Sequence, residues 1–227
     1  MKKVILVLTA ILAFVTINAQ SLEEIVKKQS QALKEDKIAN IKTMKITGKM
    51  SQMGMDLIMT IYFKAPNMVK IVMSFNGSDI IQVFDGTKAY MINPMTGSSD
   101  PQELPADQSD KLKNNETFRS PIARYFKEGK LTLEGEETVK DKPAYKIKAV
   151  DGANTFYCFI DKSSFLPVRM STSVNGINID SYAEWTDMNG IMLPKTTTTQ
   201  ASGMEFVMTF DNVELDVPID DSFFKVK

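Results

Sequence analysis

The chain has 227 residues, 43% of them hydrophobic and 24% charged, which is ordinary for a globular protein and allows one large all-β domain or two small ones. Its formal net charge is −1, so it has no basic excess to neutralise nucleic-acid phosphates, and we expect no nucleic-acid partner. Histidine is absent, which removes the commonest general base and metal ligand and indicates against an enzyme.

The N-terminal segment, residues 1–19, predicts a secretory signal peptide. Lys2 and Lys3 supply a positive start, an apolar run follows over 4–17, and Ala19 is a small residue at the predicted cut. This run is shorter than the roughly 20 residues that cross a bilayer as a helix. We expect a periplasmic mature chain over 20–227 that forms a single domain. Because no cysteine lies near the cut, we expect no lipid anchor.

The mature chain is expected to begin with an amphipathic helix over 21–36. Ser21, with Glu24 three residues later, forms a capping-box pattern that is typical of a helix start. One side of this helix, at helical spacing, holds Leu22, Ile25, Val26, Gln29 and Leu33. A helix start directly behind the signal peptide supports the predicted cut.

From about Lys42 the apolar period changes from 3.6 to 2. Apolar side chains alternate with other residues over 57–63 and again over 69–75. Turn pairs follow at fairly even intervals: Asn76-Gly77, Asp85-Gly86, Asp151-Gly152, Asn175-Gly176, Asn189-Gly190 and Ser202-Gly203. Short strands with such turns predict a meandering antiparallel sheet of roughly ten strands.

Residues 94–130 interrupt this pattern with four prolines and a polar composition, and we expect no strand there. A short helix is predicted within the region, with Ser120 as its cap, Pro121 at its first position and Gly129 as its stop. A weaker helix is predicted around 107–113. These helices are the only further cover that the sequence provides for the apolar face of the sheet.

The helices are too narrow to cover the predicted sheet. Ten strands about 4.8 Å apart give a width on the order of 48 Å, whereas a helix with its side chains is about 10 Å across. A large exposed apolar face favours aggregation, so we expect a curved sheet that forms an incomplete barrel with lid helices over a hydrophobic cavity. Methionine tolerates changing partners, and the expected inner face holds Met59, Met73, Met204 and Met208. The alternative is that these residues fill an ordinary core.

The remaining candidate groups for chemistry have simpler interpretations. Cys158, the sole cysteine, lies between aromatic residues, which favours a buried and unreactive thiol. Acidic groups at 134–137 and 216–221 are typical of a solvated hairpin end and a terminal turn rather than of catalytic or calcium sites. Arg169 is a candidate head-group contact, although a solvent-facing position is the simpler expectation. We therefore expect no catalytic residues, no metal and no cofactor.

Short turn-and-strand motifs mark the second half of the chain. They are Ile160-Asp161, then Leu166-Pro167-Val168-Arg169 after a turn, then Asp187, Gly190 and Pro194, and finally Asp220-Asp221-Ser222-Phe223-Phe224. Together they resemble the outer-membrane lipoprotein carrier superfamily. The resemblance implies a mainly β (α+β) half-barrel, with a curved antiparallel sheet of about eleven strands and lid helices over a cavity for acyl chains. That superfamily includes a soluble lipoprotein carrier, a lipid-anchored receptor, a stress-response regulator and lipid-shuttling relatives.

The sequence thus predicts a periplasmic carrier that binds acyl chains of lipoproteins or lipids and ferries them towards the outer membrane. We expect a monomer with transient protein partners in the inner and outer membranes. The predicted cavity lining is Leu57, Met59, Ile61, Phe63, Ile71, Met73, Phe206, Met208 and Phe210, with Ile122 and Phe126 on the lid. An envelope sensor that binds a protein partner through the same fold is the alternative. A lipid or glycan hydrolase is disfavoured by the absence of histidine.

Overall fold

A computed structural model describes residues 20–114, 118–152, 154–174 and 176–226. The predicted signal peptide lies outside the described residues, as does Asn175 of one predicted turn. None of the helices in the described ranges is long and apolar enough to cross a membrane.

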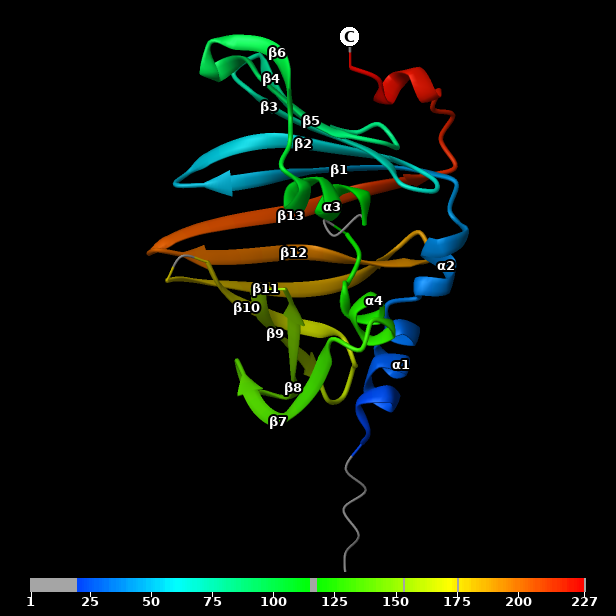
Figure 1. The fold of residues 1–227 in the computed structure, drawn as a ribbon, viewed down its shortest axis with the longest axis vertical. Helices are drawn as coiled ribbons and strands as arrows, with labels where there is room; N and C mark the ends of the chain where they lie inside the picture. The colour runs from blue at the N-terminus through cyan, green and yellow to red at the C-terminus, as the bar shows by residue number, and fades with distance from the viewer. Residues whose placement is uncertain (1–19, 115–117, 153, 175, 227) are drawn as a thin grey trace, which may run out of the picture.

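One antiparallel sheet of 13 strands makes up most of the fold. Its order is β6-β5-β4-β3-β2-β1-β13-β12-β11-β10-β9-β8-β7, so β1 beside β13 is the only neighbouring pair that is not consecutive in the chain. The end strands β6 and β7 lie at opposite ends of the molecule and do not pair, so the sheet curls without closing (Figure 1). The strands are β1 (Thr43–Gln52), β2 (Met55–Lys64), β3 (Met68–Phe75), β4 (Ser78–Phe84), β5 (Ala89–Asn93), β6 (Ser98–Glu103), β7 (Leu131–Val139), β8 (Lys142–Asp151), β9 (Asn154–Asp161), β10 (Pro167–Val174), β11 (Ile177–Met188), β12 (Ile191–Ala201) and β13 (Met204–Leu215).

Short helices accompany the sheet. In the described part of the chain they are α1 (Leu22–Ala32), α2 (Glu35–Asn40), α3 (Ala106–Lys113) and α4 (Ile122–Lys127), with 3-10 turns η1 (Pro94–Thr96) and η2 (Asp221–Phe224). The helix α3 packs against β3, β4 and β5, whereas α4 packs against α1 and β7. In Figure 1, α1 and α2 follow one another along one side of the sheet, and α3 and α4 lie in front of it. The mainly β, open half-barrel that the sequence predicts is therefore confirmed.

The first helix begins where the sequence predicts. The Ser21 hydroxyl accepts a hydrogen bond from the Glu24 N–H at 3.2 Å, and the Glu24 carboxylate accepts one from the Ser21 N–H at 3.2 Å, which completes the capping box. The helix ends at Ala32, earlier than predicted, because Lys34 adopts the left-handed conformation with φ of 54°. The helix α2 follows, and the Lys34 ammonium forms an ion pair with Asp187 on β11.

The sheet has more strands than the sequence predicts. Alternation predicts roughly ten strands and the resemblance implies about eleven, whereas the structure has 13. One error is β6, which crosses the region where no strand is expected; as a polar edge strand with a proline, it shows no apolar alternation. The predicted cap is also displaced by one residue, because α4 begins at Ile122 and its N–H donates to the Ser120 hydroxyl at 3.4 Å.

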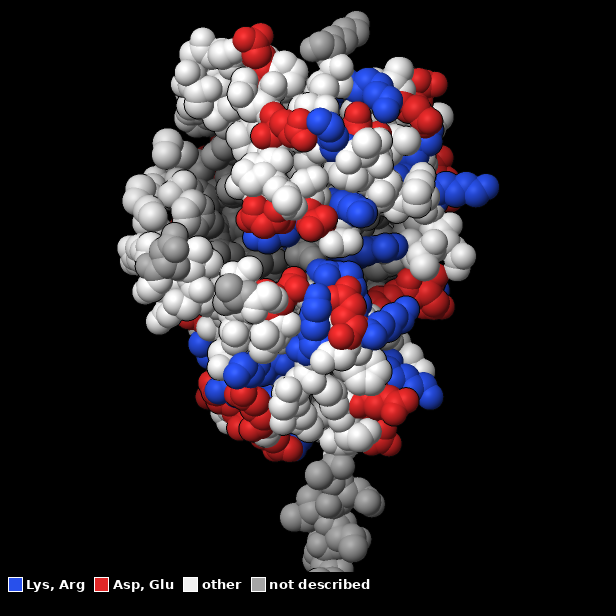
Figure 2. Space-filling view, viewed as in Figure 1, with Lys and Arg blue, Asp and Glu red and all other residues white. Residues whose placement is uncertain are grey.

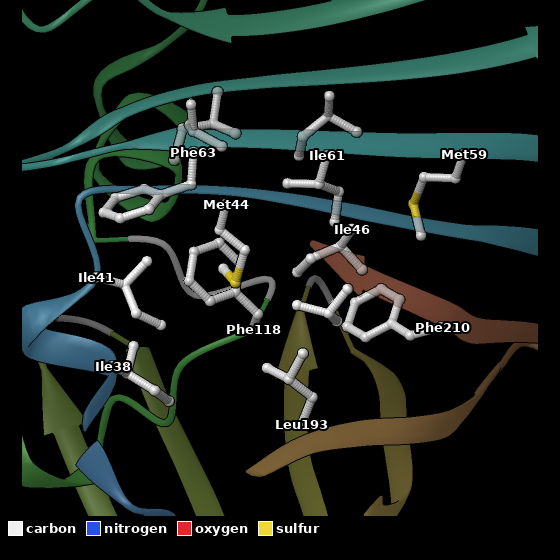
Figure 3. Packing of buried hydrophobic residues seen from close by; sticks show 14 of the residues in the cluster. Ile38, Ile41, Met44, Ile46, Met59, Ile61, Phe63, Phe118, Leu193 and Phe210 are labelled. Carbon is white, nitrogen blue, oxygen red and sulfur yellow. The ribbon is translucent and has the colours of Figure 1, made fainter. Parts of the chain in front are cut away.

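Two main hydrophobic cores lie between the helices and the sheet. The first core holds buried side chains of β1, β2, β3, β12 and β13, together with Leu112 of α3 and Phe118. The second core holds Ile25 and Val26 of α1, Ile122 of α4, and buried residues of β8 and β9. Figure 3 shows Phe118 among labelled side chains from β1, β2, β12 and β13. The connection from α3 to α4 therefore reaches into the first core.

Candidate functional site

The structure divides the predicted acyl-cavity lining between the two cores. Seven of its members lie in or against the first core: Met59, Ile61, Phe63, Ile71 and Phe210 are buried, and Met73 and Met208 are partly buried. Ile122 and Phe126 belong to the second core instead. Leu57 and Phe206 are half-buried and belong to neither. The assignment of this set to a ligand cavity stays a prediction.

Two adjoining cavities lie beside the first core. The larger cavity has a volume of about 750 Å³ and is bordered by α1, α2, α4, the end of α3 and strands β11 and β12. The smaller cavity, of about 250 Å³, lies over strands β10 to β13. They share the lining residues Phe118, Arg119, Ser120, Pro121 and Trp185. Within the described part of the chain, Met208 is the one member of the predicted lining that borders either cavity.

Residues 118–121, here called the dividing segment, form a wall that both cavities share. The Phe118 side chain is 2% exposed, and its ring lies 5.8 Å from the Phe63 ring in an edge-to-face arrangement. The Ser120 hydroxyl accepts a hydrogen bond of 3.0 Å from the Gln29 side-chain amide. The dividing segment is therefore held by the first core through Phe118 and by α1 through Ser120.

Trp185 forms a second shared wall. Its indole N–H donates a hydrogen bond of 2.6 Å to the carbonyl oxygen of Pro167, which satisfies the one polar atom of the ring. The register between β11 and β12 shifts between Glu184 and Trp185, which lies opposite Pro194. Strand alternation does not single out Trp185. Trp185 is the sole tryptophan of the chain, and this is the one feature of the sequence that could have identified it as a site residue.

Basic side chains outnumber acidic ones around the larger cavity. The charged residues that line it are Lys113, Arg119, Arg124 and Lys127, together with Glu35 and Asp36. Figure 2 shows Lys and Arg side chains gathered on this face over α3 and α4, with Asp and Glu among them. Arg124 lies 3.5 Å from the Glu128 carboxylate, and its guanidinium lies 4.1 Å from the centre of the Tyr125 ring. The larger cavity is thus locally basic in a protein whose net charge is slightly negative.

Arg119 has a different environment from the other basic residues of this cavity. It is half-buried, and among the described residues it forms no hydrogen bond or ion pair. Burial lowers the pKa of the Arg119 guanidinium from its ordinary value, while the charge of Glu35 acts in the opposite direction. Because arginine remains protonated in proteins, Arg119 is a cation partly removed from water, and no anion of the described residues pairs with it.

The groups that the sequence singles out for chemistry have structural partners. Cys158 is fully buried, as the sequence predicts, and burial raises the pKa of its thiol to about 12. Arg169 pairs with Asp180 at 2.8 Å and with Glu137 at 3.4 Å, and its guanidinium lies 4.7 Å from the centre of the Phe159 ring. The Arg169 side chain is 23% exposed, so it is half-buried and paired, and its role as a head-group contact stays a prediction.

The two acidic groups are engaged by neighbouring side chains and backbone. Glu136 pairs with Lys162 at 2.6 Å, and Asp221 pairs with Lys64 at 2.5 Å. Asp220 accepts a hydrogen bond of 2.9 Å from the N–H of Ser222 at the start of η2. Among the residues that the structure describes, no group of three His, Cys, Asp or Glu side chains is close enough to hold a metal ion.

The fold and the two cavities define an open half-barrel with ligand-sized hollows. No family model matches the chain, and no curated protein matches its sequence. The structure is similar to that of a domain from Vibrio parahaemolyticus named for outer membrane lipoprotein sorting, with a TM-score of 0.63 and 7% identity over 90% of this chain and 97% of that one. It is also similar to a DUF1329 family protein from Desulfovibrio piger, with a TM-score of 0.50 and 12% identity over 88% of this chain and 97% of that one. These likenesses show that this chain shares its fold with both proteins.

Proposed function

We propose that this protein is a carrier that shields the acyl chains of lipoproteins or lipids while they move towards the outer membrane. The main support for this proposal is the pair of adjoining cavities inside an open half-barrel. The volume of the larger cavity, about 750 Å³, falls within the range of about 300–1,000 Å³ that is usual for ligand pockets. The Vibrio parahaemolyticus domain named for lipoprotein sorting shares the fold, which supports the same reading.

The walls of the smaller cavity supply the binding energy. An acyl chain there would contact Phe118, Pro121, Met170, Trp185 and Met208. Each buried methylene contributes about 0.8 kcal/mol, so about eight of them contribute about 6 kcal/mol. The other predicted lining residues of the first core would support this wall from behind, through their packing against Phe118.

The proposal includes export to the periplasm. The signal peptide over 1–19 would be removed after Ala19, which leaves 20–227 as a single domain without a lipid anchor. This domain would act as a monomeric chaperone for its lipid, with transient protein partners at the donor and acceptor membranes. Its residues around the cavities bind and do not catalyse.

Fluorescence of the sole tryptophan tests the proposal. Because Trp185 borders both cavities, a lipid with brominated acyl chains should quench its emission, and the same lipid without bromine should not. The substitution Met208→Asp puts a charge in the smaller cavity and should abolish the quenching while secretion stays intact. Met204→Asp is the matched control on the same strand and should leave the quenching unchanged, because Met204 is 37% exposed at the start of β13.

Equal quenching of wild type and Met208→Asp would contradict this site for the acyl chain. No quenching of the wild type by any brominated lipid would contradict the carrier itself. Recovery of a stoichiometric protein partner without co-purifying lipid would instead support the envelope sensor.

A further inference from the structure

A cation without a partner among the described residues lies where the two cavities meet. The Arg119 side chain belongs to the dividing segment and borders both the larger and the smaller cavity. It is half-buried, and no hydrogen bond or ion pair joins it to any other described residue. Partial burial of a charge costs free energy unless an opposite charge or hydrogen-bond acceptor compensates it. A bound anion would provide that compensation.

The surroundings of Arg119 favour an anion on the side of the larger cavity. Lys113, Arg124 and Lys127 add positive charge there, and of these Lys113 and Lys127 are exposed. Glu35, which opposes them, accepts a hydrogen bond of 2.6 Å from the Ser30 hydroxyl and is not in contact with Arg119. Most of the side chains that line the smaller cavity are apolar, and its polar ones besides Arg119 are Ser120, Ser181, Thr197 and Arg169. Arg169 already has two carboxylate partners. The larger cavity, on one side of Arg119, therefore suits a negatively charged group, and the smaller cavity, on the other side, suits an acyl chain.

We propose that the larger cavity binds the phosphate group of an anionic lipid, with Arg119 as its main contact, while an acyl chain of the same molecule enters the smaller cavity past Trp185. This inference rests on the proposed carrier function and names the class of its cargo. The planar guanidinium donates two parallel hydrogen bonds to a phosphate, a geometry that a lysine ammonium does not provide. Lys113 and Lys127 would add attraction at longer range, which salt would screen.

A matched pair of lipids that differ by one phosphate tests the inference. The two are a monoacylglycerol phosphate with a brominated chain and the monoacylglycerol with the same chain, and their affinities are measured by quenching of Trp185. Wild type should bind the phosphate-bearing lipid about tenfold more tightly or better, as expected for a charge-assisted hydrogen bond. Arg119→Gln should lose this preference and keep its affinity for the monoacylglycerol within about twofold.

The control variant removes a positive charge elsewhere. Lys142 on β8 is exposed, borders neither cavity and has no hydrogen bond or ion pair with the described residues, so Lys142→Gln should keep the full preference for phosphate. Arg119→Lys, which keeps the charge and loses the planar fork, should show an intermediate preference. Wild type alone gives a second measurement, because raising the ionic strength from about 0.1 to 1 M should reduce the preference.

The outcomes separate this inference from the proposed function. Equal affinity of wild type for the two lipids, with no effect of Arg119→Gln, would overturn the inference and leave the carrier standing. Displacement of the phosphate-bearing lipid by millimolar inorganic phosphate would also overturn it, because the site would then bind a free anion. If neither brominated lipid quenches Trp185, the proposed function fails and the inference falls with it.

Discussion

Asp161 shows how one buried carboxylate orders the connection between β9 and β10. Its Oδ1 atom accepts hydrogen bonds from the N–H groups of Ser163 at 3.0 Å and Ser164 at 2.7 Å, and from both hydroxyls at 2.5 and 2.9 Å. Burial by itself would raise the pKa of Asp161, but these hydrogen bonds outweigh it and lower the pKa below its ordinary value of 3.8. The folded state therefore stabilises the ionised carboxylate.

The pH dependence of stability should show this contribution. A pKa that is lower in the folded state stabilises the protein above the ordinary value of 3.8, and the stabilisation is lost as the pH falls through the folded value. Asp161→Asn should lower the free energy of unfolding at pH 7 by about 1–2 kcal/mol, because charge-assisted hydrogen bonds become neutral ones. Urea unfolding from pH 7 to pH 3 should show the difference from wild type shrinking below about pH 4. A difference that stays constant with pH would contradict this role.

Gly48 allows β1 and β13, the first and last strands in chain order, to lie close together. A Cβ atom at this position would lie 2.0 Å from the carbonyl oxygen of Thr209, where the β1–β13 register shifts between Thr47 and Gly48. Gly48→Ala should therefore lower the free energy of unfolding by at least about 1–3 kcal/mol, measured by urea denaturation, because backbone must move. Thr47→Ala, which removes atoms instead of adding them, should cost about 1 kcal/mol or less. Equal small losses in both variants would show that the strands can separate easily.

Individual residues of the site differ in how far sequence could predict them. The alternation of β13 predicts Met208 on the inner face, and it borders the smaller cavity. Phe118 and Arg119 lie in a connection without periodicity, so no local pattern marks one as buried and the other as a cation beside a cavity. The position of the dividing segment depends on two contacts with residues distant in sequence. Ser120 contacts Gln29, and Phe118 contacts Phe63.

At the scale of elements, patterns with strong local chemistry are predicted well. The capping box of α1 forms as expected, and Asn76-Gly77 turns with positive φ at both residues, as a two-residue hairpin requires. The break at Lys34 is not predictable from propensity, because lysine rarely adopts positive φ. The helix α2 follows that break and packs against α1 and β12, and Lys34 forms an ion pair with Asp187 on β11.

The dividing segment should matter for stability as well as for the site. Phe118→Ala removes a ring from the first core and should lower the free energy of unfolding by about 3–5 kcal/mol, measured by urea denaturation. Phe223→Ala is the matched control, because Phe223 is 37% exposed on η2, and its loss should be smaller. A loss under about 1 kcal/mol for Phe118→Ala would show that packing of the Phe118 ring contributes little to the stability of the protein.

At the scale of the whole molecule, the mismatch between a wide sheet and narrow helices explains the open half-barrel. The 13 strands curl without closing, and the short helices fill only part of the concave side. The chain itself fills another part, because Phe118 enters the first core, where its ring contacts that of Phe63 (Figure 3). Met59 is buried in the first core, whereas Met208 borders remaining space.

Native mass spectrometry of the protein purified from its own envelope is the most direct test of the carrier. A carrier should show an added mass that solvent extraction releases as an acyl-containing species, one per chain. The same preparation of Met208→Asp should lack that mass, and Met204→Asp should keep it. Bare protein from the wild type, with no acyl species bound after incubation with envelope lipids, would contradict the proposed carrier function.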